Sequence, residues 1–97
     1  MDQTFNKHRF WTKSVITEKP SHYWYRNIHG TFIEETDAVA HLRYRLGVEN
    51  IMWSTDYPHP VSSWPTSAGV VDQQMKGVPD EERALMVAGN AARVWNL

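Results

Sequence analysis

A helix followed almost at once by an apolar strand is the feature that most constrains how this chain folds. The stretch ETDAVAHLRYRLG predicts a helix that ends at Gly47, and only residues 48–50 separate it from the apolar run IMWST at 51–55. A group of β-formers at 28–33 precedes the helix and predicts a shorter strand. Connections this short are typical of βαβ units, so the order predicts two parallel strands.

The pattern of the central helix predicts its start, its buried face and its exposed face. These assignments are Thr36 or Asp37 as the cap, Val39, Leu42 and Leu46 as the apolar face, and Arg43 and Arg45 on the solvent side. Further helices are expected from the remaining caps and apolar repeats. They are a loosely amphipathic helix within residues 2–16, a helical turn at 23–26 capped by Ser21, a helix that starts at Thr66 or Ser67 and stops at Gly77, a helix over 79–88, and a last short helix capped by Asn90 after a break at Gly89.

Length, composition and charge limit the classes of protein that this chain can represent. Its 97 residues are enough for one domain, and 41% hydrophobic residues with five tryptophans indicate a packed core. The absence of cysteine excludes disulfides and fits a reducing compartment, so a cytoplasmic location is expected. A net charge of -1 with scattered Lys and Arg argues against nucleic-acid partners. No apolar run approaches the length of a membrane span, so no membrane partner is expected.

Asp56 is the most informative polar residue, because it comes directly after the apolar run at 51–55. The carboxyl ends of parallel strands are where α/β folds place their ligand sites. Pro58 and Pro60 restrict the loop beyond this aspartate, which favours a stiff site. A purely structural role is equally compatible with the pattern, since aspartate often closes a loop by accepting hydrogen bonds from backbone N–H groups.

Three stretches resemble one enzyme family. NIMWSTDYPHPVSSWP, KPSHYWYRNIHGTF and GNAARVWNL are similar to the amidohydrolase-related superfamily, in the branch of aminocarboxymuconate-semialdehyde decarboxylase. The resemblance implies an α/β fold, namely the C-terminal part of a (β/α)8 TIM-barrel-like metal-dependent hydrolase, with about two short parallel strands and four or five helices over residues 1–97. It also implies a divalent metal, usually zinc, and hydrolysis or non-oxidative decarboxylation of a small carboxylated substrate.

The same resemblance assigns roles to the loop after the second strand. Asp56 matches the family aspartate that binds the metal or takes a proton, while Tyr57 and His59 are expected to contact substrate. The family's His-x-His metal ligands have no counterpart among the five histidines, and catalytic zinc normally takes three protein ligands. A complete site therefore requires an upstream barrel segment or other copies of the chain.

A second hypothesis is a catalytically inactive fragment that acts as a self-associating structural or interaction module. Two strands taken out of a barrel leave edges and apolar helix faces uncovered, so a homo-oligomer is expected under either hypothesis. The other polar candidates are better explained by structure: Glu34 and Glu35 by a helix N-terminus, His29 by a strand edge, and His41 by the protein surface.

Overall fold

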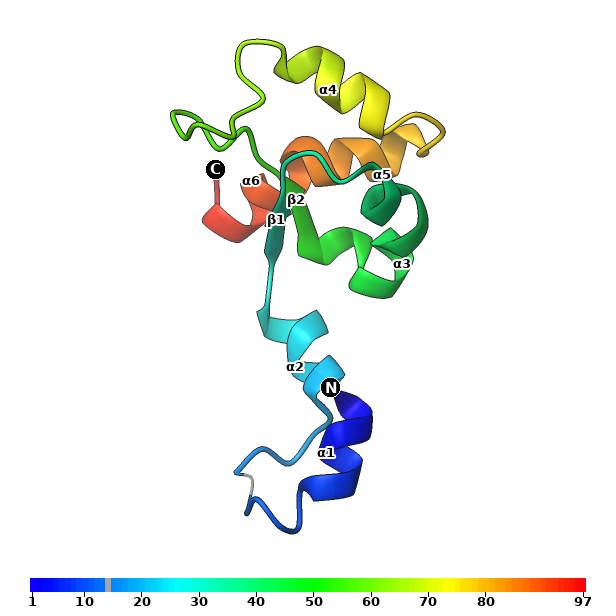
Figure 1. Cartoon of the computed structure of the whole chain (residues 1–97), viewed down its shortest axis with the longest axis vertical. Helices are drawn as coiled ribbons and strands as arrows, with labels where there is room; N and C mark the ends of the chain where they lie inside the picture. Colours follow the sequence, from blue (N-terminus) through cyan, green and yellow to red (C-terminus); the bar gives the residue numbers. More distant parts are fainter. Residues whose placement is uncertain (14) are drawn as a thin grey trace.

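The computed structural model describes residues 1–13 and 15–97 and shows an elongated molecule. Its principal extents are 50 × 28 × 27 Å, and its radius of gyration is 16.2 Å. A compact chain of this length would have a radius of gyration of about 12–13 Å. Figure 1 shows the cause: residues 1–27, here called the arm, extend away from residues 28–97, here called the body.

The arm consists of two short helices, α1 (Asp2–His8) and α2 (Pro20–Asn27). The predicted N-terminal helix is shorter than expected, because it ends at His8, and residue 14 of the predicted range lies outside the described residues. Ser21 does not cap α2, since Lys19 holds the cap position with no side-chain hydrogen bond. Ser21 instead donates from its N–H and its hydroxyl to the Asp2 carboxylate, at 2.9 and 2.6 Å, and so joins the two helices.

The body is built on two parallel strands, β1 (Gly30–Phe32) and β2 (Ile51–Trp53). Gly30 pairs with Ile51 and Phe32 pairs with Trp53, which confirms the predicted parallel order. Both strands are shorter than the sequence patterns predicted, and β2 is the better covered, with Ile51 and Met52 both buried. The carboxyl ends of β1 and β2 therefore lie at the same edge of the sheet.

Helices and helical turns surround the two strands (Figure 1). In chain order these are η1 (Ala38–Leu42), α3 (Arg43–Leu46), η2 (Val48–Asn50), α4 (Ser67–Gln74), α5 (Asp80–Ala84), η3 (Leu85–Gly89) and α6 (Asn90–Trp95). The segments η1 and η3 are π-helical, whereas η2 is a short 3₁₀ turn. No helix within the described residues is long and apolar enough to cross a membrane.

The predicted faces of the central helix are correct except at two positions beside the π-helical segment η1. Val39 is buried in the core, Leu46 packs against the core and Arg45 is exposed, as expected. Arg43 was expected to face solvent and Leu42 to face the core, yet Arg43 is only 8% exposed and Leu42 is 45% exposed. A π turn takes about one residue more than an α turn, so it shifts the inward-facing position by one residue along the chain. The guanidinium of Arg43 is stabilised inside by Glu82, by the Tyr44 hydroxyl and by backbone carbonyls. No side-chain hydrogen bond caps this helix at Asp37, contrary to expectation.

The predicted break at Gly89 and Asn90 is also wrong. Both residues have helical backbone angles, and α5, η3 and α6 follow one another without interruption. Asn90 is fully buried instead of capping a new helix, and its side-chain amide donates to the carbonyls of Val48 and Ile51 at 2.7 and 2.9 Å. This residue therefore ties the C-terminal helix to the start of β2.

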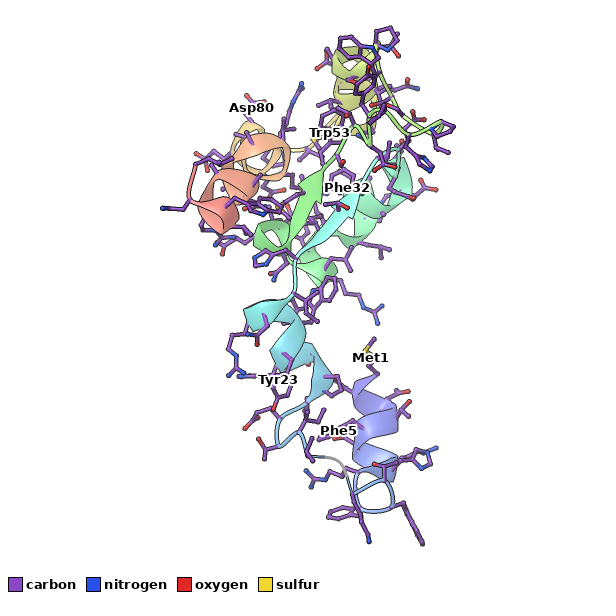
Figure 2. All side chains as sticks on the ribbon, turned by 90° about the vertical axis from the view of Figure 1, so that its left-hand side faces the viewer. Met1, Phe5, Tyr23, Phe32, Trp53 and Asp80 are labelled. Carbon is purple, nitrogen blue, oxygen red and sulfur yellow. The ribbon has the colours of Figure 1, made fainter. Side chains whose placement is uncertain are left out.

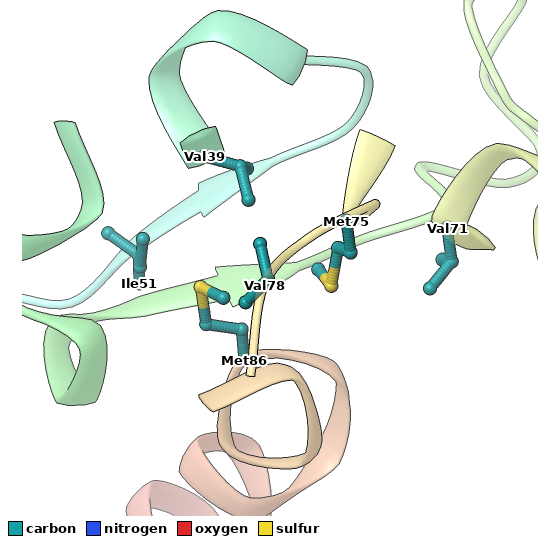
Figure 3. Close-up of a cluster of buried hydrophobic side chains, with 6 residues drawn as sticks. All are labelled: Val39, Ile51, Val71, Met75, Val78 and Met86. Carbon is teal, nitrogen blue, oxygen red and sulfur yellow. The ribbon is translucent and has the colours of Figure 1, made fainter. Parts of the chain in front are cut away.

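The hydrophobic core lies between β2 and the helices of the body (Figure 3). Two methionines, Met75 and Met86, are among its most buried side chains. Flexible thioether side chains fill irregular space well, which suits a core bounded by short elements. Its buried members are Val39, Ile51, Val71, Met75, Val78 and Met86.

Candidate functional site

An open hollow lies at the carboxyl ends of the two strands. Its volume is about 590 Å³, and its walls come from the end of β1, from the segment after β1 and from the loop after β2. The lining residues are Thr31, Phe32, Ile33, Glu34, Glu35, Ser54, Asp56, Val61 and Ser62. Parallel pairing produces this arrangement, because it places the segment after β1 beside the loop after β2.

Asp56 lies in the wall of this hollow with its side chain half exposed. Its φ of 55° is left-handed, a conformation that aspartate tolerates better than most residues. The turn around it is closed by other groups: Ser54 and Thr55 hydroxyls accept the N–H groups of Asp56 and Tyr57, and the Asp56 carbonyl accepts the His59 N–H at 2.7 Å. Within the described residues, no backbone N–H donates to the Asp56 carboxylate, so a loop-closing role does not employ that group.

His59 is the side chain that approaches the Asp56 carboxylate. Its Nδ1 lies 3.5 Å from Asp56 Oδ2 and 3.4 Å from the backbone N of Val61. The two contacts require different states of the ring, because Nδ1 must carry a proton to donate to Asp56 and must lack it to accept from Val61. The same ring nitrogen thus faces both an acceptor and a donor.

Tyr57 and His59 lie on the loop beside the hollow, whereas Asp56 lies in its wall. The Tyr57 ring packs edge-on against Trp64, with ring centroids 5.8 Å apart, and both rings are mostly exposed. Of the three predicted site residues, the structure thus brings Asp56 and His59 into contact and leaves Tyr57 packed on a neighbouring aromatic ring.

Glu34 and Glu35 are lining residues that the sequence analysis assigned to a helix N-terminus. They follow β1 in the same way that Asp56 follows β2, and this shared position together with parallel pairing was the signal that they belong to the site. The hollow is lined by these three carboxylates and by no Lys or Arg within the described residues. Its electrostatic potential is therefore negative, and it favours cations over anions.

His29 and His41 lie away from this edge of the sheet. His29 precedes β1 and lines a smaller hollow at the other end of the strands, with Arg26, Glu49 and Arg93 among its neighbours. His41 is exposed, as expected. Neither histidine joins Asp56 in the candidate site.

Comparison with protein families decides the wider assignment. The amidohydrolase family model matches residues 9–97, which is nearly the whole chain.

The chain belongs to the amidohydrolase family.

A solved member of comparable structure is 5-carboxyvanillate decarboxylase from Sphingomonas paucimobilis, with 26% sequence identity and a TM-score of 0.82. The similarity covers 99% of this chain and 28% of the decarboxylase chain. No curated protein matches the sequence. The fold is that of the C-terminal part of a TIM-barrel amidohydrolase, with two parallel strands and their helices, as the sequence analysis predicted.

Amidohydrolases generally use a divalent metal ion, so the donor set of this chain is relevant. The Asp56 carboxylate has the right chemistry, because carboxylate oxygens bind hard and borderline divalent cations. In the residues that the structure describes, no three His, Cys, Asp or Glu side chains are grouped closely enough to hold an ion. Asp56 can therefore contribute one ligand to an amidohydrolase metal site, and this chain does not contain a full set within the described residues.

Proposed function

We propose that this chain supplies the carboxylate face of a metal-dependent amidohydrolase site that decarboxylates or hydrolyses a small carboxylated substrate. The observation that carries the proposal is the position of Asp56. It follows β2 directly, it lines the hollow at the carboxyl ends of the strands, and no backbone N–H of the described residues donates to its carboxylate. This is the edge where barrel enzymes assemble their sites.

In this proposal each residue of the loop has a distinct role. Asp56 binds the metal ion or accepts a proton, and His59 orients the Asp56 carboxylate through Nδ1, which lies 3.5 Å from it. The exposed Tyr57 hydroxyl is available to donate a hydrogen bond to substrate. A divalent ion, when bound, supplies positive charge that stabilises negative charge developing on a substrate oxygen.

The charge of the hollow supports a metal requirement. Glu34, Glu35 and Asp56 would repel a substrate carboxylate, and no Lys or Arg among the described residues lines the hollow to offset them. A divalent cation held at Asp56 would reverse that balance locally. We infer that a carboxylated substrate enters only after the metal, with zinc as the expected ion.

The remaining metal ligands must come from sequence outside the three elements that form this hollow. The chain spans 28% of the length of the decarboxylase that it matches. In our proposal the other ligands lie on further barrel strands, carried either by a longer polypeptide or by another copy. The cytoplasmic location expected from the lack of cysteine stays a prediction.

Paramagnetic broadening by Mn²⁺ tests the proposed role of Asp56 even when binding is weak. Amide signals of residues 54–59 should broaden first as the ion is added to the isotopically labelled chain. Asp56→Asn should abolish that preference, whereas Asp37→Asn, an exposed aspartate outside the hollow, should leave it unchanged. Broadening centred elsewhere, or equal in the Asp56→Asn chain, would remove the basis for the proposal.

Substrate order is tested on the same sample. Addition of 5-carboxyvanillate should shift signals around the hollow when Zn²⁺ is present and leave them unshifted in its absence, because the three carboxylates repel it. Equal shifts without the metal would contradict the inferred order.

A second candidate function is a catalytically inactive, self-associating module. It is favoured by the large number of exposed apolar side chains, among them Phe10, Trp11 and Val15. It predicts that neither Mn²⁺ nor 5-carboxyvanillate shows any preference for residues 54–59.

A further inference from the structure

The arm is held in a fixed position by hydrogen bonds at its base. Trp24 Nε1 donates to the Leu46 carbonyl and the Tyr25 hydroxyl donates to the Arg45 carbonyl, each at 2.6 Å. The Asn50 side-chain amide donates to the carbonyls of Trp24, Tyr25 and Ile28. The arm therefore projects as a defined element rather than as a loose tail.

The end of the arm farthest from the body carries exposed aromatic and basic side chains (Figure 2). Phe10 is 77% exposed and Trp11 is 84% exposed, and they lie just beyond the end of α1. Arg9 lies over the rings of Phe5 and Phe10, with its guanidinium carbon 5.8 and 4.8 Å from the ring centroids. Large aromatic side chains exposed next to cations are typical of residues that anchor an interface.

Charge is divided between the two parts of the molecule. The arm contains five Lys and Arg against two acids, whereas the body contains five Lys and Arg against nine acids. None of the five arm cations forms an ion pair within the described residues. In the body, Arg43, Arg83 and Arg93 are each paired with an acid.

Several body acids are also without a cationic partner in the part of the chain that the structure describes. They include Glu34, Glu35 and Asp37, which are exposed on the segment after β1. The molecule is thus a rod about 50 Å long with a net positive arm and a net negative body. Two such rods attract each other most strongly when they lie antiparallel.

We propose that the arm is a docking element for a second copy of this chain, with the two copies antiparallel. The basic, aromatic end of each arm then lies against the acidic segment 34–37 of its partner. Such a contact is self-complementary, so a two-fold axis closes it and no filament results. A stable interface needs about 800 Å² from each partner, roughly a tenth of the 7374 Å² that one chain exposes.

Charge reversal with rescue tests the electrostatic pairing. Sedimentation velocity should show dimers of the unmodified chain, with the dissociation constant raised at least about tenfold by Arg9→Glu with Lys13→Glu. Glu34→Lys with Glu35→Lys should have the same effect, and the chain with all four changes should return to within about threefold of the unmodified value. Raising salt from about 0.05 to about 0.5 M should also weaken the dimer. A monomeric unmodified chain, or failure of the rescue, would overturn the proposal.

Cross-linking through introduced cysteines tests the antiparallel geometry without changing any charge. The chain has no native cysteine, so only the introduced ones can form disulfides. A chain with Thr12→Cys, at the end of the arm, is mixed with a chain carrying Thr36→Cys, beside the acidic segment. Mild oxidation should join the two different chains, while Gln73→Cys, exposed on α4, should not join to Thr12→Cys.

Two other outcomes would overturn the proposal and assign a different partner to the arm. Thr12→Cys chains that join mainly to each other would replace the antiparallel contact with an arm-to-arm contact. A monomeric chain that cosediments with anionic phospholipid vesicles would assign the basic aromatic end to a lipid surface instead.

Phe10→Ser with Trp11→Ser should weaken the dimer and leave the circular dichroism spectrum unchanged, because both side chains are exposed.

Discussion

Replacement of Asn90 by alanine should destabilise this chain more than any surface substitution. Asn90 is fully buried, and its amide is a donor to two backbone carbonyls, those of Val48 and Ile51. Each buried acceptor that loses its donor costs about 1–3 kcal/mol, and some of that is recovered by relaxation. We therefore expect the free energy of unfolding to fall by about 2–4 kcal/mol, a large part of the about 5–15 kcal/mol typical of a small domain.

Urea unfolding followed by tryptophan fluorescence measures this change, at a single protein concentration so that association is constant. Asn90→Asp separates the hydrogen bonds from the volume, since it keeps the shape and removes both donors, and it should be at least as destabilising as Asn90→Ala. Asn6→Ala, on the exposed surface of α1, should change the free energy by less than about 0.5 kcal/mol. A loss below about 0.5 kcal/mol for Asn90→Ala would refute the reasoning that these two bonds hold the C-terminal helix on β2.

Two further predictions concern the partly buried ion pair of Arg43 with Glu82 and two glycines. The hydrogen bond from Arg43 lowers the pKa of the Glu82 carboxyl, so Glu82 stabilises the fold above the carboxyl's unfolded pKa of about 4.3, and that contribution is lost as the pH falls through the lowered folded pKa. Glu82→Gln should thus lower Tm at pH 7 and reduce the difference in Tm between pH 7 and about pH 3; an undiminished difference would show that other carboxylates dominate. Gly47→Ala should destabilise by about 1–3 kcal/mol, because φ is 93° and the new Cβ would lie 2.6 Å from the Asn50 side-chain oxygen. Gly69→Ala, in α4 with open space around it, should instead stabilise by about 0.5–1 kcal/mol, and thermal unfolding of the pair checks both signs.

The sequence was sufficient to predict the elements that depend on local pattern. Parallel strands around a connecting helix could be inferred from short connections and from Gly47, which ends that helix with a positive φ. The family could be inferred from motifs around Asp56, and the match over residues 9–97 confirms it.

Two features depended on tertiary contacts and escaped prediction. Asparagine is a common helix cap, so its sequence context predicted a cap at Asn90. The carbonyls that Asn90 binds lie some forty positions earlier in the chain. Acidic residues are common at helix N-termini, which is the role that the sequence predicted for Glu34 and Glu35. Their place in the wall of the hollow follows from the pairing of β1 with β2. In both cases the partner is far away in sequence, so local preference could not identify the role.

The π-helical segment η1 has a consequence for how this region can change during evolution. An extra residue in a helix changes which side chain faces inward next to it, and at the end of η1 this exchanges the environments of Leu42 and Arg43. No substitution at either position reproduces such an exchange, whereas insertion or deletion of one codon within η1 does. Relatives with one residue fewer between the two strands should therefore carry an apolar residue, and no arginine, opposite the position of Glu82.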